Sequence, residues 1–200
     1  MSSIVEMLTQ QLGGSVMKQI SGQLGADEKT TGSAVAAALP TLLGALARNA
    51  TSKEGAESLA GALDKDHDGG LLDNLSSFLG NPQAGPGEGI LRHALGGNRQ
   101  RVESGISKST GLDAGAVGKL LTMLAPIIMG SLGKAKRQGG MDAGALAGLL
   151  GREQDAMAKS APQAMGLVGQ LLDADGDGDV DAGDIAKQGI GLLGKLMGKK

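Results

Sequence analysis

The sequence predicts an all-α, Gly/Ala-rich protein built from two duplicated helical units plus a C-terminal helix-loop-helix. Three observations predict this class. Apolar residues recur at helical spacing along most of the chain, no window alternates with the period of two that is typical of strands, and glycine is abundant, at 36 of 200 residues. Because 40% of the residues are apolar, we expect helices that meet through small faces, and not a disordered chain.

The first helical unit is expected to span residues 1–80. Its opening helix begins at a capping box formed by Ser3 and Glu6, followed by an apolar stripe that reaches Leu12. Proline within a helix removes a hydrogen bond, so we expect a kink or interruption at Pro40. The expected helices cover residues 4–12, about 30–48, 53–63 and 71–79.

The second helical unit is expected to span residues 90–152. It follows a linker at residues 81–89, NPQAGPGEG, which holds two prolines and three glycines. One helix is expected from residue 90, one after Asp113 to about residue 133, and one after Asp142 to about residue 150. The remaining residues, 153–200, are expected to form the helix-loop-helix.

The two units repeat each other at one offset of 86 residues. This shared offset indicates a duplicated helical unit, and the alternative is coincidence in a chain rich in Gly, Ala and Leu. The matching pairs are Ile20 and Ile106, Ser21 and Ser107, Gly25 and Gly111, Asp27 and Asp113, Pro40 and Pro126, Gly44 and Gly130, and Leu46 and Leu132.

Glycines recur four residues apart at Gly140, Gly144 and Gly148. Each glycine inside a helix costs about 1 kcal/mol relative to alanine, so some other interaction must offset that cost. We expect these glycines to allow close helix approach, and the alternative is that such helices depend on a partner or on self-association.

A short segment near the C-terminus, residues 173–184, reads DADGDGDVDAGD and contains no basic residue. Its spacing resembles the calcium loop of an EF-hand, in which ligands lie at positions 1, 3, 5, 7, 9 and 12 and glycine at position 6, here Gly178. We therefore expect Ca²⁺ as the cofactor, with Mg²⁺ as an alternative because position 12 holds Asp instead of the longer Glu. The expected ligands are Asp173, Asp175, Asp177, Asp179, Asp181 and Asp184.

A weaker copy of this pattern lies at residues 64–75, DKDHDGGLLDNL, with Gly69 at position 6. Leu75 stands at position 12 and has no oxygen to offer a cation. A second metal site and a metal-free Asx turn are both open here. The second site would use Asp64, Asp66, Asp68 and Asp73.

Several function classes find no support in the composition. The chain has no Cys, so thiolate metal sites and disulfides are excluded. Its formal net charge is only −2 and Phe78 is its one aromatic residue, which argues against a nucleic-acid partner. The two histidines belong to no catalytic motif; His67 is expected to point outward, and His93 is expected on a helix surface or in packing. We therefore expect no enzyme activity.

The N-terminal residues, MSSIVEMLTQQ, lack the basic and apolar regions of a secretory signal, so a cytoplasmic location is expected, although leaderless export stays open. Residues 30–47 and 120–133 are uncharged but contain proline and glycine, and are expected to be buried central helices. The tail GIGLLGKLMGKK places lysines beside Leu and Met, which keeps a membrane-surface role as the rival alternative.

Three segments, in this order, resemble a bacterial family catalogued as domain of unknown function 937. They read LDKDHDGGLLDNLSSFLG, GEGILRHALGG and STGLDAGAVGKLLTMLAPIIMGSLGK. The resemblance spans most of residues 1–151 and implies a bacterial, mostly helical protein without implying an activity. The acidic loop at residues 173–184 looks like an addition to the family pattern.

Together these features predict a non-enzymatic, calcium-binding structural or interaction protein, in which Ca²⁺ orders the C-terminal helix pair. The expected partner is a second copy or another protein. A membrane-surface protein is the first alternative, and an uncharacterised enzyme is the second.

Overall fold

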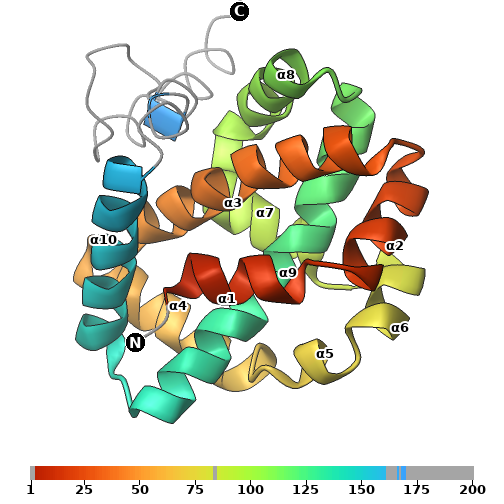
Figure 1. Ribbon diagram of the computed structural model, residues 1–200. Helices are drawn as coiled ribbons and strands as arrows, with labels where there is room; N and C mark the ends of the chain where they lie inside the picture. The colour runs from red at the N-terminus through yellow and green to blue at the C-terminus, as the bar shows by residue number, and fades with distance from the viewer. Residues whose placement is uncertain (1–2, 83–84, 161–165, 167, 170–200) are drawn as a thin grey trace, which may run out of the picture.

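The structure, a computed structural model, describes residues 3–82, 85–160, 166, 168 and 169. This part of the chain is helical and contains no strand, which confirms the all-α prediction (Figure 1). A short 3₁₀ turn, η2, covers Gly96–Asn98. The α-helices are α1 Ile4–Gln11, α2 Ser15–Leu24, α3 Glu28–Asn49, α4 Lys53–Asp66, α5 Gly70–Asp73, α6 Leu75–Gly80, α7 Gly87–Leu95, α8 Arg99–Thr110, α9 Ala114–Gly139 and α10 Ala143–Ser160.

Helix α9 is the centre of the fold. All residues from 120 to 133 are buried, so this stretch is covered on every side. A helix that is apolar all round is expected in such a position. It packs against α1, α2, α3, α4, α5, α7 and α8, which lie around it in Figure 1.

Helices α3 and α9 are both long and apolar enough to cross a membrane by length and composition alone. Within the fold, however, 72% of the most apolar window of α3 and 83% of that of α9 are buried. The other helices cover these surfaces, as the sequence predicted for buried central helices.

Local signals set the beginnings of several helices. The Ser3 side chain accepts hydrogen bonds from the N–H groups of Val5 and Glu6, and the Ser3 N–H donates to Glu6 Oε2 at 3.2 Å, which confirms the capping box. The Ser3 hydroxyl also donates to Oε2 of the buried Glu153 at 2.8 Å. This bond ties the start of α1 to α10, 150 residues later.

Three pairs from the 86-residue repeat have the same local structure. Gly25 and Gly111 end α2 and α8 with positive φ angles of 65° and 76°. Asp27 and Asp113 cap α3 and α9, and Pro40 and Pro126 lie inside those helices. The units at residues 1–80 and 90–152 nevertheless contribute to one continuous hydrophobic core.

Some predicted boundaries differ from the structure. The expected helix at residues 71–79 is divided at Asn74 into α5 and α6. Helix α7 begins at Gly87, inside the expected 81–89 linker, and α10 continues to Ser160, past the expected boundary at residue 152. Helices α2 and α8 were not predicted. Most of the expected helix-loop-helix at residues 153–200 lies outside the described residues.

The predicted close approach at Gly140, Gly144 and Gly148 is wrong for the described part of the chain. Gly140 has a φ of 56° and ends α9, and a Cβ on Gly144 or Gly148 would meet only a side-chain atom of its own segment at 3.5 Å. A spacing of four residues places glycines on one face, but it does not determine whether another helix covers that face.

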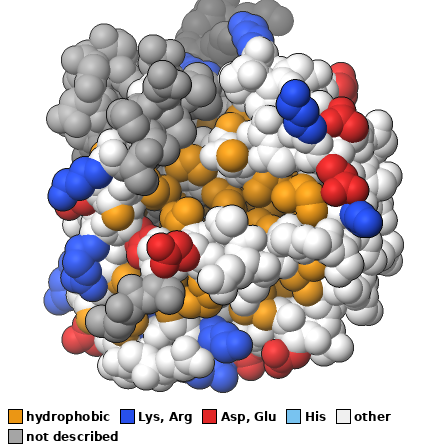
Figure 2. All heavy atoms as spheres, viewed as in Figure 1, with side chains coloured by type: hydrophobic (Ala, Val, Ile, Leu, Met, Phe, Trp, Pro, Cys, Tyr) orange, Lys and Arg blue, Asp and Glu red, His pale blue; other side chains and the backbone are white. Residues whose placement is uncertain are grey.

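Part of the apolar core remains visible at the surface. Figure 2 shows hydrophobic side chains gathered between α1 and α3 on the viewed face, with most charged groups towards the edges. Partly buried residues of α1 and α3, including Val5, Met7 and Ala37, pack against the core. The surface between α1 and α3 is therefore less polar than the neighbouring surface of the described chain.

Candidate functional site

The predicted calcium ligands lie outside the described residues. Asp173, Asp175, Asp177, Asp179, Asp181 and Asp184 all belong to this undescribed segment. The described part of the chain contains the earlier acidic segment, several ion pairs and a cavity lined by both histidines.

The acidic segment at residues 64–75 forms a helix end followed by a tight turn. Helix α4 continues through Asp66, and His67 is its C-cap. Asp68 Oδ1 accepts a hydrogen bond from the N–H of Gly70 at 2.9 Å, which is the geometry of an Asx turn. Gly69 has a φ of 98°, a conformation that favours glycine. The sequence left a second metal site and a metal-free Asx turn as alternatives, and the structure contains the Asx turn.

Basic residues in the last turn of α9 pair with two of the four acids of this segment. Lys136 Nζ lies 2.7 and 2.9 Å from the two carboxylate oxygens of Asp64, and Arg137 Nη2 lies 3.2 Å from Asp68 Oδ2. In the described part of the chain, no group of three or more His, Cys, Asp or Glu side chains is placed to hold a metal. Asp64, Asp66, Asp68 and Asp73 therefore do not gather around a common cation position there.

Close backbone packing seats the turn on α9. A Cβ on Gly133 would lie 1.8 Å from the carbonyl oxygen of His67, and a Cβ on Gly69 would lie 3.1 Å from the Cβ of Lys134 and 3.3 Å from the carbonyl oxygen of Gly130. Only a residue without a side chain fits at Gly133, because the atom it meets belongs to the backbone and cannot rotate away. This contact fixes the end of α4 against the central helix.

A second close approach joins α7 to α9. A Cβ on Gly87 would lie 2.1 Å from the carbonyl oxygen of Thr122. That carbonyl is the one left without its helical N–H partner by Pro126, four residues later. The start of α7 therefore covers the point where proline interrupts the hydrogen bonds of α9.

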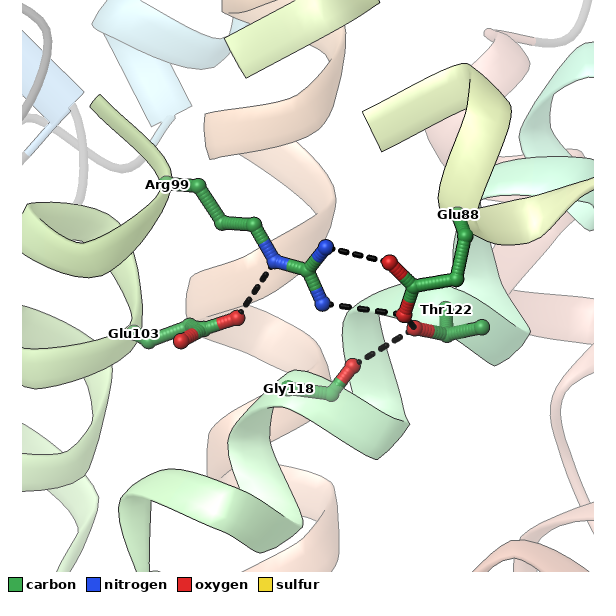
Figure 3. Close-up of polar contacts among 5 residues, drawn as sticks. All are labelled: Glu88, Arg99, Glu103, Gly118 and Thr122. Carbon is green, nitrogen blue, oxygen red and sulfur yellow. Dashed lines mark hydrogen bonds and ion pairs between the residues drawn. The ribbon is translucent and has the colours of Figure 1, made fainter. Parts of the chain in front are cut away.

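An ion-pair network lies beside this contact (Figure 3). Arg99 of α8 forms a two-pronged ion pair with Glu88 of α7, and its Nη2 lies 3.0 Å from Glu88 Oε1. The Arg99 Nε donates to Glu103 Oε1 at 2.8 Å. The Thr122 hydroxyl lies 2.9 Å from both Glu88 Oε1 and the carbonyl oxygen of Gly118. The network thus joins α7, α8 and α9.

The network predicts a pH-dependent contribution to stability. Hydrogen bonds from Arg99, and then from Thr122, hold the pKa of the Glu88 carboxyl below its ordinary value. Because the folded-state pKa is depressed, the stabilisation is present above the unfolded-state pKa and is lost as the pH falls through the folded-state pKa. We expect Glu88→Gln to lower the free energy of unfolding by at most about 1 kcal/mol at pH 7, since the pair is partly exposed.

Urea unfolding at pH 7 and at about pH 3 would measure this difference. The cost of Glu88→Gln should shrink as the pH falls from the unfolded-state pKa towards the depressed folded-state pKa of the wild-type carboxyl. Asp155→Asn, at an exposed position of α10, is the matched control and should have no such pH dependence. If Glu88→Gln lowered the free energy of unfolding equally at both pH values, the pH-dependent stabilisation could not come from the Glu88 carboxylate.

Both histidines line a cavity of about 580 Å³ formed by α3, α4 and α7. His67 is half-buried, and this desolvation lowers the pKa of its imidazole. His67 is therefore only partly exposed, where the sequence predicted an outward-pointing side chain, whereas His93 is exposed on a helix surface, as expected. The Asn49 side chain donates to the carbonyl oxygens of His93 and Ala94, at 3.0 and 3.3 Å, and so fixes the last turn of α7 to the end of α3.

Comparison with known proteins identifies one family. A family described as "Bacterial protein of unknown function (DUF937)" matches residues 6–135. The match covers most of α1 and continues into α9, and it ends before α10 and the acidic loop. No curated protein and no solved structure matches the chain.

Proposed function

The chain belongs to the DUF937 family of bacterial proteins of unknown function, and we propose that it is a non-enzymatic calcium-binding protein with a structural or interaction role. One observation carries the proposal: residues 173–184 place oxygen ligands at every EF-hand position and glycine at position 6. Bound Ca²⁺ would order the two helices predicted on either side of the loop.

The distribution of charge supports a cation at this loop. Residues 1–160 contain 15 acidic and 15 basic residues, so the formal net charge of −2 arises in residues 161–200, from six Asp and four Lys. All six Asp fall within twelve residues, without a basic residue among them. Carboxylates held a few ångströms apart repel one another, and a divalent cation relieves that repulsion.

The earlier acidic segment provides a contrast. There, Lys136 and Arg137 pair with Asp64 and Asp68 and supply the neutralising charge from within the fold. Residues 173–184 have no basic residue of their own to do the same, and the nearest in sequence is Lys187. This difference favours metal binding at the C-terminal loop over metal binding at residues 64–75.

The surface of the described chain supports an interaction role. Contiguous exposed apolar side chains often mark sites of association, and Figure 2 shows such side chains between α1 and α3. A second copy of the chain or another protein is the proposed partner. Light scattering with and without a chelator would show whether calcium occupancy changes the assembly.

Isothermal titration of the full chain is expected to show calcium binding with a Kd between about 10⁻⁵ and 10⁻³ M, because the shorter Asp184 replaces glutamate at position 12. Replacing Asp173 and Asp177 together by alanine should abolish the binding heat. Asp64→Ala with Asp68→Ala is the matched control, since it removes two acids that are paired with lysine and arginine. The control should retain the heat.

Four results would separate the alternatives. A folded chain that shows no heat at millimolar Ca²⁺, or heat that is lost only in the Asp64 and Asp68 control, would overturn the proposal. Asp184→Glu should tighten calcium binding if position 12 is a ligand. Co-sedimentation with anionic vesicles that is unaffected by chelator would instead support a membrane-surface role for the basic tail.

A further inference from the structure

We propose that the cavity between α3, α4 and α7 binds small organic cations that carry an apolar body, with an alkylamine as the simplest example. The proposal uses no part of the C-terminal acidic loop, and so it stands apart from calcium binding. It depends on the size of the cavity, its apolar wall and the charge of the side chains that line it.

The cavity has the dimensions and composition of a small-molecule site. Its volume, about 580 Å³, lies within the range typical of ligand pockets. Leu46 of α3, Ile90 of α7 and Met129 of α9 contribute to an apolar wall. The close contacts at Gly133 and Gly87 hold α4 and α7 against α9, so the surrounding backbone is fixed at both helices.

The charge of the lining favours a cation. Asp66 supplies a carboxylate, and no Lys or Arg is among the described residues that line the cavity. Asp66 makes no ion pair with a basic residue in the part of the chain that the structure describes, unlike Asp64 and Asp68. Its carboxylate is therefore available to a ligand that brings its own positive charge.

The other polar groups are consistent with the same ligand. Desolvation lowers the pKa of His67, so its imidazole is neutral at pH 7 and adds no positive charge to the lining. The amide nitrogen of Asn49 is engaged by two backbone carbonyls, which leaves its amide oxygen as an acceptor. Acceptors around an apolar wall suit an ammonium group attached to a hydrocarbon.

Three probes of equal chain length would test the charge preference: octylamine, octan-1-ol and octanoate. The imidazole NMR signals of the full chain report binding directly, because the only two histidines, His67 and His93, both line the cavity. We expect octylamine to shift both signals saturably. Octanoate should bind at least about fivefold more weakly, and the alcohol should fall between them.

Two variants, each with a control, test whether the probes bind in this cavity. Asp66→Asn should weaken octylamine binding about threefold to fivefold and leave octan-1-ol unchanged, whereas Asp73→Asn, outside the cavity lining, should change neither. Gly89→Leu should block both probes by filling the cavity, since a Cβ at Gly89 has no neighbour within 4 Å and the fold can accept it. Gly22→Leu, at another open helical position, is its control.

Octanoate binding as tight as that of octylamine would overturn the charge assignment. Unshifted histidine signals with all three probes, or unchanged binding in folded Gly89→Leu, would overturn the site itself. The chain with Asp173→Ala and Asp177→Ala should bind octylamine as the wild type does, in the presence of chelator. Loss of calcium binding and loss of amine binding are thus separate results.

Discussion

Replacing Gly133 by alanine is expected to lower the free energy of unfolding by about 3 kcal/mol. The added Cβ would lie 1.8 Å from the carbonyl oxygen of His67 and 3.0 Å from its carbonyl carbon. Those atoms belong to the C-cap of α4, so relief requires the whole helix end to move away from α9. Such a shift also displaces Asp64 and Asp68 from Lys136 and Arg137.

Gly61→Ala is the matched control for this prediction. Gly61 lies on the exposed face of α4, and a Cβ there would have no neighbour within 4 Å. The same chemical change should therefore raise the free energy of unfolding by about 0.5–1 kcal/mol, through helix propensity and the unfolded chain. Urea unfolding monitored by circular dichroism would measure both variants, and a Gly133→Ala chain as stable as the wild type would contradict the close approach.

The contrast between glycines shows what spacing in the sequence can and cannot predict. Gly140, Gly144 and Gly148 recur at helical intervals, yet no neighbouring helix approaches them in the described chain. Gly87 and Gly133 carry no such pattern, but each meets a backbone carbonyl of a distant segment. The difference arises from tertiary packing, which a local pattern does not encode.

The helices with strong local signals were predictable. The capping box at Ser3 set the start of α1, Asp113 capped α9, and the apolar length of α9 indicated its burial. Helix α8 was missed because only Val102 and Ile106 of its twelve residues are buried, which leaves a narrow apolar stripe. Helix α8 packs against α9, and its first residue, Arg99, is the centre of the ion-pair network.

The candidate sites also differ in how much of each could be predicted from the local sequence. The calcium-loop pattern at residues 64–75 could be recognised locally, but its basic partners lie in α9, 72 residues away in the case of Asp64 and Lys136. The cavity was missed because His67 ends one helix and His93 lies on another, and nothing in the sequence shows that α4 and α7 face the same space. The long-range signals in the sequence, charge balance and the 86-residue repeat, do not show which helices face this cavity.

The second large effect is expected in the shared core. Leu43→Ala in α3 and Leu121→Ala in α9 should each lower the free energy of unfolding by about 2–5 kcal/mol. Both side chains are buried, with exposed fractions of 1% and 0%, and both belong to the same continuous core. Leu24→Ala, at a partly buried position of α2, is the control and should cost less.

The shape of the transition tests how the two repeated units are related. If residues 1–80 and 90–152 were separate domains, Leu43→Ala would move one urea transition and Leu121→Ala another. Since α9 packs against helices of both units, we expect both variants to shift one transition without changing its slope. Two transitions that respond separately would contradict the single core. One shared transition would mean that a ligand in the α3, α4 and α7 cavity stabilises both units together.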